Sequence, residues 1–225
     1  KIVFGHILYR IKALSSFGYV SAGDLGGFLE SEKNLSQNGN AWVSGNARVY
    51  GNAEVSGNAE VYGNAEVYGN AEVYGNARVS GSAEVSDNAR VYGNARVSGS
   101  AEVYGNARVY GNAEVYGNAE VYGNAEVYGN AEMSGNARVS GNAEVSKIGS
   151  IFWIGAVGSR NDTATFFRCT DGVVRVTCGC FFGNLDEFAK KVRKTHGDND
   201  HAKVYMLAIE MAKIRIGDKK EKTEE

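Results

Sequence analysis

The sequence predicts a mainly β protein built on a single-stranded parallel β-helix of triangular cross-section, with about six coils. A six-residue unit, V-[YS]-G-N-A-[ER], runs without interruption from Val43 to Ser146, and a short fixed period is typical of solenoids. Proline is absent from all 225 residues, which suits paired strands throughout. The composition changes on both sides of the repeats, which divides the chain into an N-terminal cap (1–40), the β-helix (41–146) and a small α+β domain (147–225).

Each repeat is expected to form one short strand followed by one corner. In the order A-E-V-Y-G-N, Ala and Val lie two residues apart and point to one face of a strand, while the residues on either side of Val point to the other. Gly and Asn follow, and both tolerate the backbone conformation of a tight corner. The valine position recurs every six residues from 43 to 145, and only Met133 departs from it. Three repeats per coil then give a prism about 29 Å tall.

Residues 1–40 break the period and are predicted to cap the solenoid. Residues 7–14 are apolar enough for a strand or a short helix, and residues 24–27 indicate a turn. The end of a solenoid exposes unpaired backbone groups that a terminal segment has to cover. Capping is therefore the expected role of this segment.

After Ser146 the sequence predicts a small domain of strands and helices. Asp171 and Gly172 are a hairpin signal between two strands. Asn184 is expected to cap a helix from Leu185 to about Lys194, because Asn is a preferred N-cap residue. The remaining predicted elements are strands at 151–154, 163–168 and 173–178, a second helix at about 200–216, and a charged tail at 217–225 that is expected to fray.

Folding three repeats into each coil stacks the outward side chains in columns. One column contains four successive glutamates, which repel one another unless basic groups lie nearby: Arg48, Glu66, Glu84, Glu102, Glu120 and Arg138. On another side four tyrosines follow without interruption: Tyr74, Tyr92, Tyr110 and Tyr128. Tyrosine is enriched in interfaces, so the second column is a predicted oligomer surface. The alternatives are that these tyrosines only stack on one another, and that the glutamate column is a partner site.

The repeat V-x-G-N-A-x resembles the hexapeptide repeat of left-handed β-helix proteins, the fold of many acyltransferases. The valine and alanine columns carry this resemblance over residues 41–146. It implies a left-handed coil, whereas the general rule for parallel crossovers favours a right-handed one. Such proteins commonly form threefold assemblies, and cyclic symmetry is ordinary among homo-oligomers. We therefore expect a homotrimer.

The segments that flank the repeats resemble hexapeptide-repeat proteins encoded by phages and prophages. The resemblance implies a phage or prophage origin and, with it, the cytoplasm of the bacterial host. It rests on residues 8–14 (LYRIKAL), 22–28 (AGDLGGF), 34–36 (NLS) and 42–43 (WV) before the repeats, and on 158–161 (GSRN), 178–181 (CGCF) and 195–197 (THG) after them.

The repeats offer no titratable group suited to general acid–base catalysis near neutral pH. His6, His196 and His201 all lie outside residues 41–146. The resemblance implies that an acyltransferase would bring a histidine to a groove between subunits, and no loop interrupts the coils to build such a site. We predict that the protein is not an enzyme, with acyltransferase activity as the least favoured alternative.

The C-terminal domain contains the residues best suited to binding a small anion. Ser159, Arg160 and Asn161 are expected in a loop between strands, where a hydroxyl, a guanidinium and backbone amides suit a phosphate or carboxylate. Arg168 and His196 are predicted to add positive charge. The alternative is a polar turn beside a solvated helix face. The sequence contains no nucleotide-binding or Walker fingerprint, and no cofactor is predicted.

Cys178, Cys180 and His196 are weak candidates for a metal site. Cys169 and His201 add further residue types that bind zinc, but the spacing is not that of a standard zinc finger. Small buried thiols are the more ordinary interpretation, so no bound metal is predicted. Three cysteines, an odd number, favour a reducing compartment.

The overall composition argues against nucleic-acid and membrane partners. The formal net charge is −2, so the chain has no basic field for nucleic acid. No apolar stretch approaches the length of a membrane-spanning helix, and the first residues lack the layout of a signal peptide. A cytoplasmic protein is the expectation.

These features predict a non-enzymatic, phage-derived scaffold and binding protein, trimeric, whose C-terminal domains present a recognition surface to a partner such as a host protein. The second prediction is a sequestering protein that captures a small anionic, nucleotide-like ligand and so counters a host defence. It would use Ser159, Arg160, Asn161 and His196 at a subunit junction. A co-purified ligand would distinguish the second function from the first.

Overall fold

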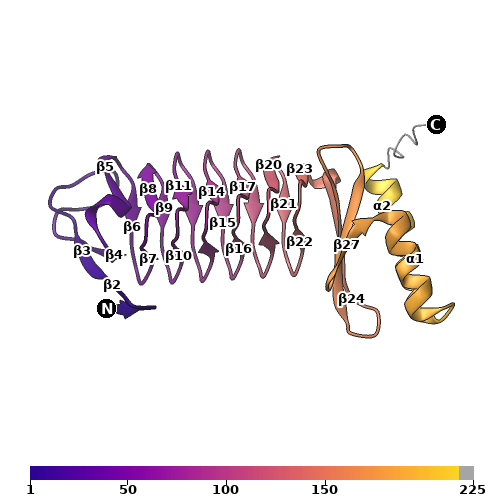
Figure 1. Ribbon diagram of the computed structural model, residues 1–225. Helices are drawn as coiled ribbons and strands as arrows, with labels where there is room; N and C mark the ends of the chain where they lie inside the picture. Colours follow the sequence, from indigo (N-terminus) through magenta and orange to yellow (C-terminus); the bar gives the residue numbers. More distant parts are fainter. Residues whose placement is uncertain (218–225) are drawn as a thin grey trace.

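The computed structural model describes residues 1–217 and shows a parallel β-solenoid that carries a small domain at its C-terminal end (Figure 1). The predicted fold class is confirmed. Residues 218–225, which belong to the tail predicted to fray, lie outside the described residues. None of the described helices combines the length and the apolar character that a membrane crossing requires.

The three sides of the solenoid are three parallel sheets, here called faces 1, 2 and 3 in chain order. Face 1 contains β4 (Leu25–Leu29), β7 (Arg48–Val49), β10 (Glu66–Val67), β13 (Glu84–Val85), β16 (Glu102–Val103), β19 (Glu120–Val121) and β22 (Arg138–Val139). Face 2 contains β5 (Leu35–Gly39), β8 (Glu54–Gly57), β11 (Glu72–Val73), β14 (Arg90–Val91), β17 (Arg108–Val109), β20 (Glu126–Asn130) and β23 (Glu144–Lys147). Face 3 contains β6 (Trp42–Val43), β9 (Glu60–Val61), β12 (Arg78–Val79), β15 (Arg96–Val97), β18 (Glu114–Val115) and β21 (Glu132–Met133).

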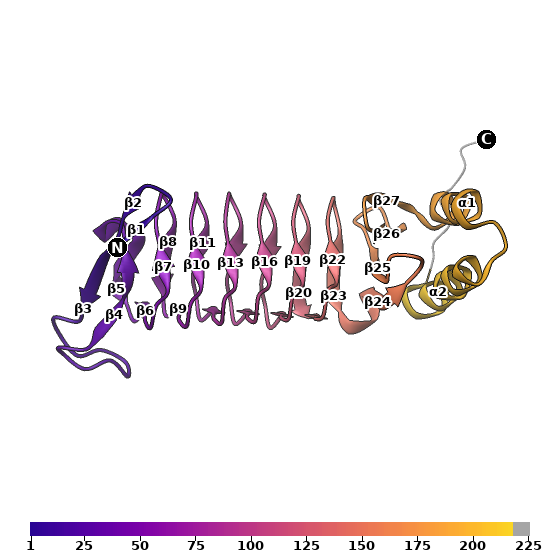
Figure 2. The ribbon, with the colours of Figure 1, turned by 90° about the horizontal axis from the view of Figure 1, so that it is seen from below.

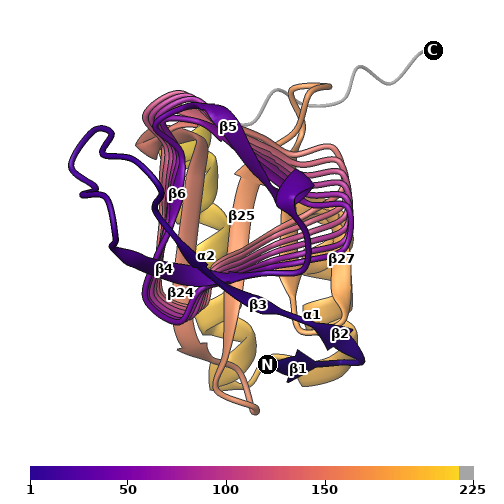
Figure 3. The same ribbon diagram turned by 90° about the vertical axis from the view of Figure 1, so that its left-hand side faces the viewer.

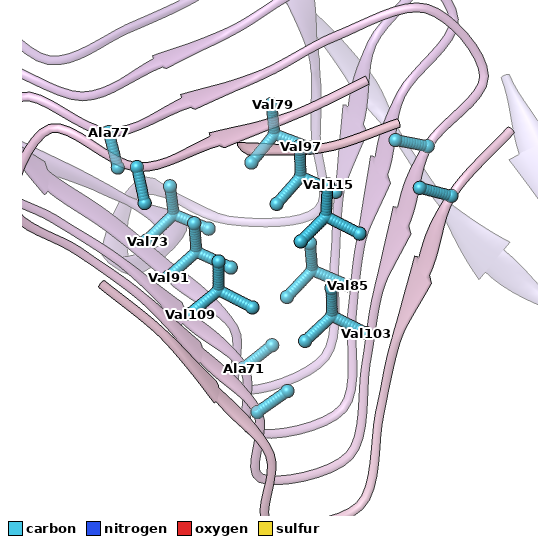
Figure 4. Packing of buried hydrophobic residues seen from close by; sticks show 14 of the residues in the cluster. Ala71, Val73, Ala77, Val79, Val85, Val91, Val97, Val103, Val109 and Val115 are labelled. Atoms are coloured by element: carbon cyan, nitrogen blue, oxygen red, sulfur yellow. The ribbon is translucent and has the colours of Figure 1, made fainter. Parts of the chain in front are cut away.

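The core is made of stacked valine and alanine columns, as the repeat predicts. Strands pair with the strands one coil away, so that Val67 lies beside Val49 on one side and Val85 on the other. Valines from all three faces converge on the axis, and their side chains are fully buried (Figure 4). Identical residues therefore stack on identical residues, and the apolar column excludes water along its length.

The coil is left-handed, in agreement with the resemblance of the repeat. Seen from the N-terminal end, the chain passes from β4 through β5 to β6 in an anticlockwise direction as it recedes from the viewer (Figure 3).

The solenoid has about seven turns rather than the six predicted. β4 and β5 come from residues assigned to the cap, yet they pair in parallel with β7 and β8. The six-residue repeat is interrupted here because a longer connection, which includes the short 3-10 helix η1 (Glu32–Asn34), joins the two strands. Asn34 is buried and donates from Nδ2 to the carbonyl oxygens of Gly51 (3.1 Å) and Ala53 (2.8 Å), which fastens this connection to the next coil.

The cap proper is formed by the first strands of the chain. β3 (Tyr9–Lys12) pairs antiparallel with β4 and covers the free edge of face 1. The hairpin of β1 (Ile2–Val3) and β2 (His6–Ile7) lies against the outside of face 1, where Val3 and Leu8 pack with Tyr50 and Tyr68.

The corners depend on glycines in the left-handed backbone region and on asparagine ladders. Gly93 is typical, with φ +73° and only 3.0 Å between the position of a Cβ and the backbone nitrogen of Gly111. The neighbouring asparagines bond along the axis, as in the 3.0 Å contact from Asn94 Nδ2 to Asn112 Oδ1. Such amide ladders add a hydrogen bond for each coil.

The C-terminal domain contains one more strand than predicted. The residues around Phe181 join the sheet as a fourth strand, while the predicted cap at Asn184 is confirmed, since its side chain accepts from the backbone of Glu187. After the short 3-10 helix η2 (Ile148–Ser150), the elements are β24 (Ile151–Val157), β25 (Asp162–Arg168), β26 (Val174–Cys178), β27 (Phe181–Asn184), α1 (Leu185–His196) and α2 (Asp200–Ile216).

The antiparallel sheet of this domain lies between the last coil and the two helices (Figure 2). Residues of β25 alternate between the two sides: Phe167 belongs to the core of the solenoid, and Phe166 packs with the helices. Thr165 Oγ1 accepts from the backbone nitrogen of Arg138 at 3.0 Å. One sheet therefore closes the open end of the solenoid and provides the core of the domain.

Candidate functional site: the outer columns of the solenoid

The predicted tyrosine column on face 2 forms a continuous stack. The rings of Tyr74, Tyr92, Tyr110 and Tyr128 follow one another at centroid distances of 4.9 Å, and successive planes are within 4° of parallel. Their side chains are half-buried. Tyr110 donates to Glu126 Oε2 at 2.9 Å, and Tyr128 donates to Glu144. Stacking and hydrogen bonds together hold the rings as a firm, partly apolar strip.

The glutamate column on face 1 is neutralised only at its ends. Arg48 pairs with Glu66 at 3.1 Å, and Arg138 pairs with Glu120 at 2.9 Å. Among the described residues, Glu84 and Glu102 have no basic partner, although Glu84 accepts a hydrogen bond from Tyr68 at 3.2 Å. The centre of this face therefore carries uncompensated negative charge.

The tyrosine column of face 1 is interrupted beside these two glutamates. Tyr50 stacks on Tyr68 at 5.2 Å and Tyr104 on Tyr122 at 5.1 Å, but Ser86 stands between the two pairs. The missing ring leaves a pocket of about 270 Å³, here called the notch, which is lined by Tyr68, Glu84, Ser86, Asp87, Glu102 and Tyr104.

Asp87 completes the notch at the corner between faces 1 and 2. It replaces the usual glycine and takes the same backbone conformation, with φ +58°. Its Oδ2 accepts from the backbone nitrogen of Gly105 at 3.0 Å. Asp tolerates this conformation better than most residues, so the chain keeps its corner while gaining a carboxylate.

Sequence reasoning missed the notch, although its signal was present. The repeat that begins at Val85 is V-S-D-N-A, with Ser86 and Asp87 at positions where Tyr and Gly are usual. Only the charged column of face 1, and not its tyrosine column, was considered in the prediction from sequence. An interruption becomes a pocket only when the neighbouring rings are known to stack, and the structure supplies that geometry.

Burial and like charge raise the pKa of Glu102 above the usual value for glutamate. Desolvation is the largest cause, followed by the repulsion of Glu120 and Glu84. Burial, and then Glu120, also raises the pKa of Tyr104 to about 12. The notch is thus a place where negative charge is costly in the folded chain.

We predict that Glu102→Gln stabilises the protein at pH 7 by about 0.5 kcal/mol, because it removes a like charge directly opposite its neighbours. A raised folded pKa means that the carboxylate opposes folding above that pKa and that this loss disappears as pH falls through it. The difference between wild type and variant in urea unfolding should therefore shrink as the pH is lowered from 7 towards the ordinary pKa of glutamate. Glu114→Gln on face 3, where Arg96 pairs with Glu114, is the control. A constant difference at all pH values would contradict the prediction.

The predicted anion-binding residues of the C-terminal domain are only partly brought together. Ser159, Arg160 and Asn161 lie in the turn between β24 and β25, as expected. The guanidinium of Arg160 and the carboxylate of Asp162 both lie against Gly179, at 3.1 Å and 3.3 Å from the position of a Cβ. An anion at Arg160 would therefore also meet the charge of Asp162.

His196 lies at the end of α1 beside two other rings. Its ring is 5.9 Å from that of Tyr205 and 5.7 Å from that of His201. The Tyr205 hydroxyl donates to the carbonyl oxygen of Val157 at 3.4 Å and is 3.7 Å from Cys178 Sγ. Burial raises the pKa of Cys178, which keeps its thiol protonated.

Arg168 does not join the other predicted residues, because it stands at the opposite end of β25. Its guanidinium donates to the carbonyl oxygens of Gly172 (3.1 Å), Ile216 and Gly217 (2.7 Å). It therefore fixes the C-terminus of α2, a role that basic side chains often take.

The cysteines are spread through the domain. Cys169 is buried, Cys178 is half-buried and Cys180 is exposed. Within residues 1–217, no group of three or more His, Cys, Asp or Glu side chains is arranged to hold a metal ion, so the weak candidates Cys178, Cys180 and His196 do not form such a group.

A second cavity, of about 590 Å³, lies at the N-terminal end of the solenoid. Its lining includes Phe17, Leu29, Leu35, Ala41 and Trp42. The edge of Phe17 meets the Trp42 ring at 5.6 Å. The cavity marks the place where a further coil would continue the core, and the cap closes it incompletely.

The comparison with protein families agrees with the fold. A family model described as "YdcK Beta solenoid repeat" matches residues 41–57, 71–87, 83–99, 89–103 and 101–117, all within the coils from β6 to β18. The chain is thus similar to these repeats over part of its solenoid. No curated protein matches the sequence.

Proposed function

We propose that the protein is a non-enzymatic scaffold that acts through binding: a trimer whose solenoids form the shared centre and whose C-terminal domains present the recognition surface. The β-solenoid with its continuous apolar column supplies the rigid element. We further propose a phage origin and a place in the cytoplasm of the host cell, on the resemblance of the flanking segments.

The observation that carries the oligomer is the tyrosine column of face 2, which no segment within residues 1–217 covers. The N-terminal hairpin packs against Tyr50 and Tyr68, the first two tyrosines of the face 1 column, and so covers only that end of face 1. Tyr19, from the loop after β3, interacts with Glu60 and Arg78 of face 3. Face 2 presents the longest tyrosine stack of the three, and stacked tyrosines favour a protein interface.

Binding rather than catalysis is favoured by where the histidines stand. His6 Nδ1 donates to the Glu30 carboxylate at 2.9 Å near the N-terminal end of the solenoid, and His196 and His201 belong to the C-terminal helices. The acyltransferases that the repeat resembles need a catalytic histidine beside the coils, and these three histidines lie elsewhere.

Sequestration of a nucleotide-like anion stays a secondary prediction, since Asp162 stands beside Arg160. Mass spectrometry of the purified native protein tests it. A nucleotide that is retained by wild type and lost in Arg160→Ala would establish this alternative and displace the scaffold proposal.

We predict that Tyr92→Ser/Tyr110→Ser converts the trimer to monomers at micromolar concentration, measured by light scattering. Serine occupies the equivalent position at both ends of this column, at Ser56 and Ser146, so the coils should still form. The matched control is Tyr62→Ser/Tyr116→Ser on face 3, which should remain trimeric. A monomeric wild type, or equal dissociation of both double variants, would contradict the proposed assembly.

A further inference from the structure

The notch on face 1 has the dimensions of one missing ring. Successive rings in the tyrosine columns lie 4.9 to 5.2 Å apart. Tyr68 and Tyr104 are two coils apart, so one planar group fits between them at the usual spacing of the stack. Ser86 is nine-tenths buried and forms the floor. A flat group entering the notch would stack on an aromatic ring on each side.

The walls of the notch also require that the planar group be positively charged. Glu84 and Glu102 have no ion-pair partner among the described residues, and Asp87 adds a third carboxylate. A guanidinium is planar, stacks on aromatic faces and donates to carboxylates in the same plane. An ammonium group offers the charge without the plane. The combination of two aromatic walls with carboxylates therefore selects a guanidinium.

We propose that, in the trimer proposed above, the notch of each subunit receives the Arg90 guanidinium of a second copy of this chain. The inference rests on that proposed assembly and names the residues that join the subunits. Each contact then involves face 2 of one subunit and face 1 of the next, which is a heterologous contact that closes into a ring.

The placement of Arg90 makes this contact geometrically direct. Ser86 and Arg90 stand on either side of the corner formed by residues 87–89, on face 1 and face 2 respectively. When three such corners meet around an axis parallel to the solenoids, the corner residues of face 2 of one copy lie nearest the corner residues of face 1 of the next. Four residues along an eighteen-residue coil change the height by only about 1 Å, so Arg90 approaches at the level of the notch.

The strand directions support the same pairing of columns. Neighbouring solenoids turn in the same sense, so their strands run in opposite directions where the two faces meet. The tyrosine column of face 1 therefore lies opposite the charged column of face 2. Arg90 then points at Ser86, and Arg108 lies over the ring of Tyr104, where a cation is also favourable.

The charges of these two faces are complementary at four of their six shared levels. The opposite pairs are Arg48 with Glu54, Glu84 with Arg90, Glu102 with Arg108, and Arg138 with Glu144, whereas Glu66 with Glu72 and Glu120 with Glu126 are like pairs. At the corner between faces 2 and 3, like charges share three of the five levels: Glu54 with Glu60, Arg90 with Arg96, and Glu126 with Glu132. Complementarity of this kind sets the register and the choice of partner surface.

Within its own subunit, Arg90 forms only a weak ion pair, so turning its side chain outward costs little stability. Its Nη2 lies 3.4 Å from Glu72 Oε1, and both side chains are nearly half exposed, at 46% and 43%. An exposed pair of this kind contributes little to stability. In the notch the same guanidinium would meet Glu84, Asp87 and Glu102 between two aromatic rings, and these interactions strengthen as the neighbouring subunit excludes water.

The test measures the subunit concentration at which the full-length trimer dissociates, by sedimentation equilibrium. Arg90→Ala and Arg90→Lys should raise it at least about tenfold, because Lys keeps the charge but not the stacking plane. Ser86→Tyr fills the notch with the usual residue of the repeat and should do the same while leaving the fold intact by circular dichroism. The matched controls on face 3, Arg96→Lys and Ser80→Tyr, should behave as wild type.

The outcomes separate this inference from the proposed function. A trimer that is unaffected by Arg90→Ala and Ser86→Tyr overturns the inference and leaves the trimeric scaffold standing. Full retention of assembly in Arg90→Lys overturns the stacked guanidinium. A wild type that is monomeric at all concentrations overturns both. If Ser86→Tyr fails to fold, the two Arg90 variants, which change only an exposed side chain, still decide the question.

Discussion

Replacement of Val97 by aspartate should remove the central coils from the cooperative fold. The Val97 side chain is fully buried in the valine and alanine columns, with no polar group nearby to receive a carboxylate (Figure 4). An unpaired charge in such a place costs at least about 3 kcal/mol. Because each coil contacts only the coils on either side, amide hydrogen exchange should accelerate first in the strands stacked on β15, namely β12 and β18.

The neighbouring residue provides the control for this prediction. Arg96 points outward on the same strand and pairs with Glu114 at 3.3 Å. Arg96→Asp introduces the same side chain one position away, on the solvent side, and should cost less than about 1 kcal/mol in urea unfolding. Equal costs for Val97→Asp and Arg96→Asp would show that the valine columns do not face the core.

Gly81→Ala should lower the free energy of unfolding by about 2 kcal/mol or more. Gly81 has φ +71°, a conformation that costs an L-residue about 1–2 kcal/mol. A Cβ at this position would also lie 2.7 Å from the carbonyl oxygen of Gly99 in the next coil, which forces the two coils apart. The change should appear as a lower midpoint in thermal and urea unfolding.

The adjacent corner residue tests whether the backbone conformation is the cause. Ser82 is exposed and occupies the place of the usual asparagine, so Ser82→Ala should leave the stability within about 0.5 kcal/mol of wild type. If Ser82→Ala were as damaging as Gly81→Ala, the cost would lie in the side-chain ladder rather than in the glycine.

The period of the sequence was sufficient to predict most of the solenoid. A repeat of six with Val and Ala two residues apart requires short strands, one buried face and a corner after each strand. The same period assigns every outward residue to a column, so the stack from Tyr74 to Tyr128 was predictable from the sequence alone. Asn184 was likewise predictable, because an N-cap depends on local sequence alone.

The features that were missed depend on contacts between distant residues. β4 belongs to the solenoid although its glycines and phenylalanine do not follow the repeat, because pairing with β7 decides its conformation. The fourth strand at β27 forms because β26 offers it an edge. Arg168 was assigned to an anion site by its charge, but the end of α2 lies beside it in the fold. The notch appears only when rings two coils apart are compared.

The strand register also limits how this protein could change in length. Partners on one face are separated by eighteen residues, as Val67 and Val85 are. Duplicating eighteen residues would add one complete coil and keep the C-terminal domain in the same orientation relative to the three faces. Duplicating six would swing that domain through a third of a revolution and break the match of charges across the corner, so length can vary freely only in steps of three repeats.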